Sequence, residues 1–188
     1  MKESRVLLIL MLLAAFVSCT KDRSVQQTDS IPNGDFENWT SGLNLENWKT
    51  NSCPSCEPPF ETYIVQKDSP AYHGRYAAKF IYNNLYPAVA DNKFAVSGHP
   101  LFIGAYVKCN LVSMDTVSLI IHLYNNGVVV DSGVWNGTSS FSEYRHISVP
   151  ISQHSSESDS ALIIITGGHT RGTTGINTIF WIDNLMFE

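Results

Sequence analysis

The stretch that decides the fold is Val117-Ser118-Leu119-Ile120-Ile121-His122-Leu123-Tyr124-Asn125-Asn126-Gly127-Val128-Val129-Val130. It holds two runs of β-branched, leucine and aromatic residues, 117–124 and 127–130, which are typical of strands. Asn125-Asn126-Gly127 favours a tight turn, because Asn and Gly accept the positive backbone angles that such a turn requires. The stretch therefore predicts an antiparallel β-hairpin.

Runs of the same kind follow one another along most of the chain. Clusters of Gly, Pro, Asn or Ser separate them, as expected for turns between strands. No amphipathic helical pattern of useful length and no βαβ alternation is present, so we predict an all-β fold, an antiparallel β-sandwich or jelly roll. The further predicted strands are 62–65, 76–82, 101–108, 144–149, 161–166 and 178–187.

The amino terminus has the three parts of an export signal. Lys2 and Arg5 precede the apolar run 6–17, which is too short to span a bilayer, and Ser18-Cys19 follows it. A small residue before a cysteine at this distance resembles the lipobox at which lipoprotein signal peptides are cleaved and the cysteine is acylated. The alternative is an ordinary signal peptide cleaved near Ser18.

We therefore divide the chain into a signal peptide (1–18), a flexible tether (19–30) anchored by a lipid on Cys19, and one domain (31–188). The tether is polar and lacks apolar periodicity. Lys21-Asp22 resembles the export tag of surface lipoproteins in Bacteroides-like bacteria. The expected location is the outer membrane, at its surface or its periplasmic face.

The charge balance argues against a nucleic-acid partner. The chain carries 17 acidic and 12 basic side chains, a formal net charge of −5, and no basic run that would neutralise a phosphate backbone. Aromatic residues make up 11% of the chain, and in an exported, weakly charged protein they are candidate surfaces for neutral ligands.

Cys53-Pro54-Ser55-Cys56 lies in a proline-rich loop. In an oxidising compartment we expect Cys53 and Cys56 to form a disulfide that staples the loop, with Cys109 left over. A redox pair would need a helix after the first thiol, and zinc would need a second pair of ligands at matched spacing. The sequence shows neither.

Ile31-Pro32-Asn33-Gly34-Asp35-Phe36-Glu37-Asn38-Trp39 resembles the opening strand of jelly-roll carbohydrate-binding modules, and of the related carbohydrate-metabolism domain of Bacteroides-type lipoproteins. The resemblance covers the whole mature domain and implies a galactose-binding-like jelly roll that binds carbohydrate. Asn184, where the family more often has a second Asp, and the cysteine loop depart from the pattern. The later landmarks, in order, are Asn47-Trp48, 73–79, 100–108 and 181–185.

The resemblance also implies a structural calcium ion near the chain ends. Related modules hold the ion where the first and last strands meet, and here the expected ligands are Asp35, Glu37 and Asp183, with backbone carbonyls near Gly74. The alternative is that Asp35 and Asp183 accept hydrogen bonds from backbone donors at turns and strand ends.

Alternation with a period of two predicts which side chains leave the core along 101–109, 117–124 and 144–149. In each strand aliphatic residues point one way, and ring or polar residues point the other. Rings flanked by hydrogen-bonding groups suit a sugar, although Tyr is also a good strand former on a solvated face. The residues expected to share one non-core face and to bind ligand are Tyr106, Lys108, His122, Tyr124, Tyr144 and His146.

Aromatic residues near predicted turns provide a second candidate binding site, made by Trp39, Trp135 and Tyr86. Trp48 and Trp181 are instead expected in the core, because large aromatic side chains are mostly buried.

The sequence shows no catalytic motif. Acids such as Glu143 and Asp131 are scattered, and His169 is expected in a loop. We therefore predict a non-catalytic lipoprotein that captures a neutral polysaccharide at the cell envelope. An adhesive or scaffolding protein that contacts other proteins is the alternative, and a glycan-active enzyme is a third interpretation. Strong salt dependence of binding would instead point to an acidic glycan held by Lys108 and the histidines.

Overall fold

The computed structural model describes residues 30–53, 55, 64–82, 87–112, 115–152, 157–168 and 178–188. The predicted signal peptide and the predicted tether up to residue 29 lie outside these ranges, and so do Cys19, Cys56, Tyr86 and His169. All regular elements in the described part are strands. That part also contains no helix of the length and apolarity needed to cross a bilayer.

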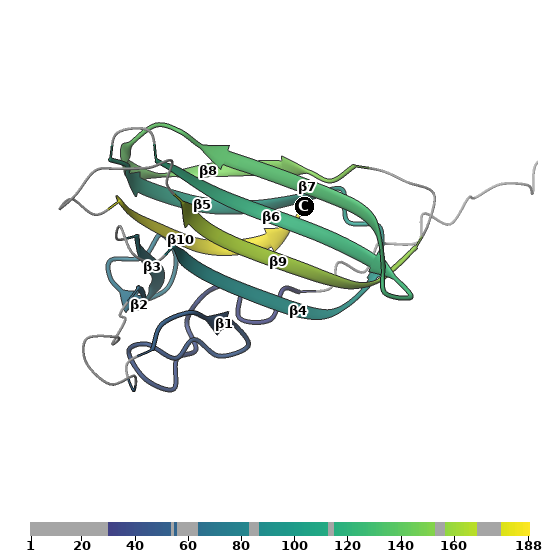
Figure 1. Ribbon diagram of the computed structural model, residues 1–188, viewed down its shortest axis with the longest axis horizontal. Helices are drawn as coiled ribbons and strands as arrows, with labels where there is room; N and C mark the ends of the chain where they lie inside the picture. The colour runs from purple at the N-terminus through teal and green to yellow at the C-terminus, as the bar shows by residue number, and fades with distance from the viewer. Residues whose placement is uncertain are drawn as a thin grey trace, which may run out of the picture.

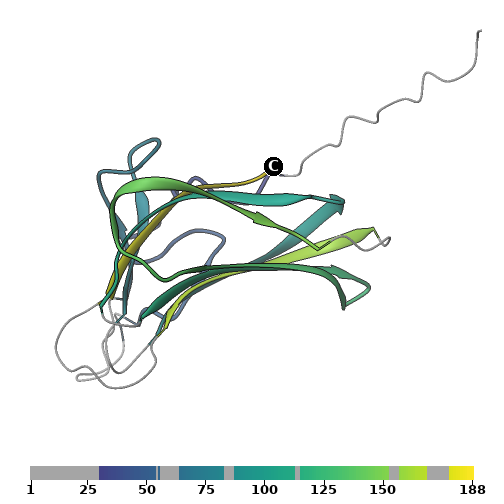
Figure 2. The ribbon, with the colours of Figure 1, turned by 90° about the horizontal axis from the view of Figure 1, so that it is seen from above.

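The described strands form two antiparallel sheets that lie face to face (Figures 1 and 2). The β6 sheet has the order β1-β4-β9-β6-β7, and the β10 sheet has the order β2-β3-β10-β5-β8. The predicted all-β sandwich is confirmed. The strands are β1 (Lys49–Thr50), β2 (Val65–Asp68), β3 (Ala77–Tyr82), β4 (Ala88–Gly98), β5 (Phe102–Asn110), β6 (Thr116–Asn125), β7 (Val128–Gly137), β8 (Phe141–Pro150), β9 (Ser158–Gly168) and β10 (Thr178–Phe187).

The hairpin between β6 and β7 forms where it was predicted. Asn125 pairs with Val128, so the turn consists of two residues. Asn126 has φ 50° and Gly127 has φ 79°, the left-handed conformation that these two residue types adopt most readily.

Strand β4 was not predicted, because Ala, Asp, Asn and Lys are weak strand formers. It nevertheless pairs with β9 along most of its length. Ala88 and Ala90 are fully buried, and the amide of Asn92 donates a 3.0 Å hydrogen bond to the carbonyl of Pro32. Burial between neighbouring elements therefore outweighs the low strand propensity of this segment.

The core lies between the two sheets, and the predicted alternation holds. Ile103, Ala105 and Val107 of β5 are buried, as are Leu119, Ile121 and Leu123 of β6. The rings of Phe80 and Phe180 stack at 4.5 Å inside it. Burying such apolar surface is the main favourable contribution to folding.

The opening segment packs against the last strand, as the sequence predicted. Leu185 donates its backbone N–H to the carbonyl of Gly34 at 2.7 Å. Trp48 is buried, as expected, with its ring 5.4 Å from that of Phe36. This contact brings Glu37 close to the outward side of β10, where the candidate site begins.

Candidate functional site

The structure divides the six predicted ligand-binding residues between two opposite faces of the sandwich. Strands β5 and β8 belong to one sheet and β6 to the other, so the prediction of a single shared face is wrong. Alternation determines the side of a strand on which a residue lies, but not the sheet that the strand joins. The outward face of the β10 sheet, here called the Trp181 face, carries Lys79, Tyr106, Lys108, Tyr144, His146 and Trp181.

The remaining two residues, His122 and Tyr124, lie on the outward face of the β6 sheet. The ammonium of Lys93 lies 5.1 Å from the centre of the Tyr124 ring. His122 stands in register between Ser132 and Leu162, and its Nδ1 is buried without a hydrogen bond. These side chains do not contribute to the Trp181 face.

Trp181 is at the centre of the candidate site, although it was expected in the core. Phe180 and Ile182 point inward and are buried, so Trp181 between them must point outward. It stands in register with Lys79 on β3 and Lys108 on β5. The ammonium of Lys79 lies 5.6 Å from the centre of the indole ring, and that of Lys108 lies 4.2 Å from it.

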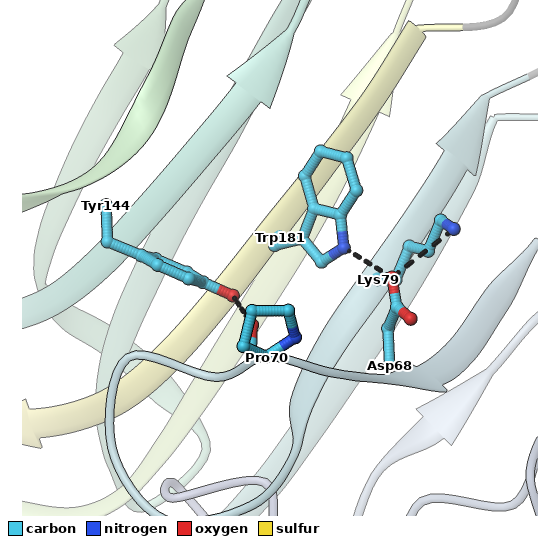
Figure 3. A network of polar contacts seen from close by, with 5 residues as sticks. All are labelled: Asp68, Pro70, Lys79, Tyr144 and Trp181. Atoms are coloured by element: carbon cyan, nitrogen blue, oxygen red, sulfur yellow. Dashed lines mark hydrogen bonds and ion pairs between the residues drawn. The ribbon is translucent and has the colours of Figure 1, made fainter.

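A hydrogen bond to Asp68 fixes the orientation of this indole (Figure 3). The Nε1–H of Trp181 donates to Asp68 Oδ2 at 2.7 Å, and Lys79 Nζ lies 3.3 Å from the same oxygen. Burial alone would raise the pKa of Asp68, but the indole, the Ser69 amide and the Lys79 charge together hold the pKa below its ordinary value. Figure 3 shows the indole broadside and the Tyr144 ring edge-on.

Residues 69–76 form a loop that covers the other half of the Trp181 face. The Tyr144 hydroxyl donates to the carbonyl of Pro70 at 3.3 Å (Figure 3), and the rings of Tyr72 and Tyr106 stack at 3.4 Å with 9° between their planes. Burial raises the pKa of Tyr144. The predicted ligand anchors Tyr106 and Tyr144 therefore hold this loop.

Two carboxylates anchor the same loop through its backbone. Asp183, which is completely buried, accepts the amide hydrogens of Tyr72 and His73 at 2.8 Å each. Glu37 Oε1 accepts those of residues 75 and 76 at 2.6 and 2.9 Å. Burial raises the pKa of Asp183 even though these amides favour its charged form.

The calcium ligands expected from the sequence do not fit a calcium ion. Calcium is held by about six to eight oxygen ligands. The carboxylates of Glu37 and Asp183 instead accept hydrogen bonds from backbone N–H groups. Asp35 is exposed. Within the described ranges no group of three or more His, Cys, Asp or Glu side chains is placed to hold a metal ion. For Asp183, the geometry matches the alternative of a carboxylate that satisfies backbone donors.

A pocket of about 410 Å³ opens beside Trp181, where β5, β8 and β10 lie next to one another. Its volume is within the usual range for small-molecule sites, and it combines two aromatic rings with a cation and neutral polar groups. These are the components of a site that binds a ring-shaped polar molecule. The lining includes Lys108, Asn110, Ser140, Phe141, Ser142 and Trp181.

The other predicted aromatic candidates are not part of this site. Trp135 is in β7 opposite Leu119 and packs partly buried against the core, so it is not a loop residue. Trp39 also packs against the core and donates its Nε1–H to the carbonyl of Phe36 at 2.6 Å. Tyr86, the third candidate, lies outside the described residues.

The two described cysteines differ in oxidation state. Cys53 is disulfide-bonded, and its predicted partner Cys56 lies outside the described ranges. Cys109 is free and buried, and its thiol donates to the carbonyl of Ser139 at 3.2 Å. Of the acids weighed as a catalytic pair, Asp131 is buried on β7 and Glu143 is exposed on β8 of the other sheet.

The sequence matches no protein-family model and no curated protein. Among solved structures, the chain is similar to a provisionally assigned glycoside hydrolase from Bacteroides thetaiotaomicron VPI-5482, with a TM-score of 0.57 and 10% identity over 86% of this chain and 69% of the other. It is also similar to carbohydrate-binding modules from the β-sandwich superfamily, with a TM-score of 0.55 and 10% identity over 87% of this chain and 62% of the other.

The chain has the fold of β-sandwich carbohydrate-binding modules. The predicted resemblance is thus confirmed for the fold. A third similar structure is an arabinose-bound α-L-arabinofuranosidase, with a TM-score of 0.53 and 11% identity over 85% of this chain. Our chain spans 26% of that enzyme. At these identities the likeness concerns the fold, and a fold can carry many functions.

Proposed function

We propose that this protein is a non-catalytic carbohydrate-binding lipoprotein whose Trp181 face captures polysaccharide at the cell envelope. The observation that carries the proposal is the Trp181 indole, whose Nε1–H is held by Asp68 and which lines an open pocket that also has polar side chains. The similarity in fold to carbohydrate-binding modules is consistent with this use of the surface.

The chemistry of the pocket suits a sugar. The C–H groups of a pyranose pack on an aromatic ring, while its hydroxyls need hydrogen-bonding partners. Trp181 provides a ring on the outward face, and Asn110, Ser142 and Lys108 provide polar groups around it. Phe141 also lines the pocket, but its ring packs partly against the core. The hydrogen bond to Asp68 orients the indole before the ligand arrives, which lowers the entropic cost of binding.

We further propose that a lipid on Cys19 holds the domain at the outer membrane. The proposal rests on the apolar run that ends at Ser18-Cys19 and on the polar segment that follows it. In a host that processes lipoproteins, mass spectrometry should find an acylated amino terminus at Cys19, and the protein should sediment with membranes. A mature chain that begins elsewhere without acyl groups would contradict this anchor.

A glycan screen tests the binding function. The full-length protein in detergent micelles is applied to a panel of plant and host polysaccharides by affinity gel electrophoresis, and each ligand is then assayed for released reducing ends. We expect retardation by at least one polysaccharide without hydrolysis. Release of reducing ends would favour the enzyme interpretation, which the fold similarity to glycoside hydrolases makes worth testing. Binding to no polysaccharide would favour an adhesive or scaffolding role.

A further inference from the structure

Two lysines flank Trp181, and among the described residues only one of them has a carboxylate partner. Lys79 Nζ lies 3.3 Å from Asp68 Oδ2, so its charge is compensated. Lys108 Nζ instead lies 4.2 Å from the Trp181 ring and 5.0 Å from the Tyr144 ring. In the part of the chain that the structure describes, Lys108 forms no ion pair. Its positive charge is therefore available to a ligand.

Lys108 also borders the pocket, together with the Trp181 ring. Cation–π contacts with Trp181 and Tyr144 hold the ammonium over the face of the indole, next to the surface on which a sugar ring would pack. An ammonium has three N–H donors and no acceptor, so the partner that satisfies it best is an anion. A sugar that packs on Trp181 carries its ring substituents at its rim, near this group.

The other charges around the site do not cancel that of Lys108. Asp68 is used by Trp181 and Lys79, and Asp183 is completely buried beneath the loop. Glu188 is held by His146 Nε2 at 2.7 Å. The formal net charge of the whole chain is −5, but salt screens distant surface charges, with a Debye length of about 10 Å at 0.1 M. Among the described residues, Lys108 is therefore the cation at the pocket that no carboxylate pairs with directly.

We propose that the pocket takes an anionic sugar residue, whose carboxylate or sulfate group accepts hydrogen bonds from Lys108 while its ring packs on Trp181. This inference rests on the proposed carbohydrate-binding function and specifies its ligand class. It replaces the neutral polysaccharide expected from the sequence. The reason is that Asp68 pairs with Lys79 and leaves the charge of Lys108 without a carboxylate partner. The sequence did not reveal this pairing.

Three polysaccharides of galactose-type sugars test the inference: neutral β-galactan, carboxylated polygalacturonate and sulfated carrageenan. Dissociation constants are measured for the full-length protein in detergent micelles, first at low salt and then at about 0.5 M NaCl, a concentration at which surface charges are screened. Lys108→Gln removes the charge and Lys108→Arg keeps it. Lys93→Gln is the matched control, because it removes one lysine that also lies over a tyrosine ring, but on the opposite face.

We expect one of the two anionic polymers to bind more tightly than galactan, and the preferred one identifies the anionic group. Lys108→Gln should weaken that binding about five- to tenfold, because it removes a charge-assisted contact, while Lys108→Arg and Lys93→Gln should leave it within about twofold. High salt should weaken it too.

Equal or tighter binding of galactan would overturn the inference of an anionic ligand but leave carbohydrate binding intact. Equal effects of Lys108→Gln and Lys93→Gln would have the same consequence. Binding to none of the three polymers would also overturn the inference. The broader glycan screen then decides separately whether the proposed carbohydrate-binding function fails as well.

Discussion

Trp181 and Asp68 connect the middle of the β10 sheet with its edge strand β2 through one hydrogen bond of 2.7 Å. The bond has two effects. It orients the indole, and it helps to keep the pKa of Asp68 below its ordinary value. The contact therefore contributes stability that is present above the ordinary carboxyl pKa and is lost as the pH falls through the lowered value.

Trp181→Phe keeps a ring at this position but removes the N–H donor. We expect the pKa of Asp68 to rise toward its ordinary value, so that Asp68 contributes less stability above that pKa and less of it is lost on acidification than in the wild type. Carboxyl chemical shifts of Asp68 followed by NMR during a pH titration measure this directly. Asp159, whose pKa is also lowered but through Asn126 and Ser160, serves as an internal control. An unchanged Asp68 titration would show that the indole does not act on this carboxylate.

Asp183 anchors the loop 69–76 as a buried acceptor for backbone hydrogens. Asp183→Asn should destabilise the protein by about 1–3 kcal/mol, because either orientation of the amide places an N–H₂ group opposite backbone N–H groups. Urea unfolding measures the change, and Asp35→Asn, at an exposed position, is the control. Equal stability of the two variants would contradict the anchoring role.

The loop 69–76 shows how one element uses residues that sequence reasoning assigned to the ligand. Tyr106 stacks on Tyr72, Tyr144 holds Pro70, and Glu37 accepts two amides near the loop's end. The loop leaves the pocket beside Trp181 open. Its shape depends on Gly74, which has φ 72° and lies against the Glu37 carboxylate, where a Cβ would collide with it.

Gly74→Ala should therefore destabilise the protein by about 1–2 kcal/mol from the left-handed backbone alone, with a further cost from the displaced Glu37. Gly42→Ala is the matched control, because a Cβ added there would meet nothing within 4 Å and the residue also sits in a loop. Thermal unfolding of the two variants compares them. A Gly74→Ala variant as stable as Gly42→Ala would mean that the loop tolerates another conformation.

Sequence reasoning was most successful where a single strand or turn contains the whole signal. The β6–β7 hairpin and the inward residues of β5, β6 and β8 are local patterns, and they were predicted correctly. The composition of the Trp181 face depends on which strands are neighbours, which no local pattern specifies. Alternation through Phe180 and Ile182 does indicate that Trp181 points outward, and this signal was available but was overridden by the general tendency of Trp to be buried.

Residues that act from outside the predicted strands were the most difficult to foresee. Tyr72 reaches the site from a loop, and Asp68 ends the edge strand β2, which was predicted at 62–65 but lies at Val65–Asp68. Their roles follow from contacts more than 100 residues apart along the chain, such as Asp68 with Trp181 and Tyr72 with Asp183. Such long-range contacts cannot be read from the neighbouring sequence.

At the scale of the whole molecule, the carboxylates expected to bind calcium near the chain ends have other partners. Glu37 and Asp183 already receive backbone hydrogen bonds from the loop. We therefore expect protein purified free of metal to unfold at the same temperature in excess chelator and in millimolar calcium, since only a ligand that binds the folded state raises its stability. A higher Tm in calcium would reinstate the ion predicted from the sequence.

The central claim is that the Trp181 face binds carbohydrate, and a pair of alanine variants tests it most directly. Affinity for the polysaccharide found in the glycan screen is measured by isothermal titration calorimetry for the wild type, Trp181→Ala and Tyr124→Ala. Tyr124 is the control, because it is an aromatic residue on the opposite face. We predict that Trp181→Ala loses about tenfold or more in affinity, as is usual for a central aromatic anchor, while Tyr124→Ala binds like the wild type. Unchanged affinity in a folded Trp181→Ala variant, or a loss confined to Tyr124→Ala, would contradict the claim.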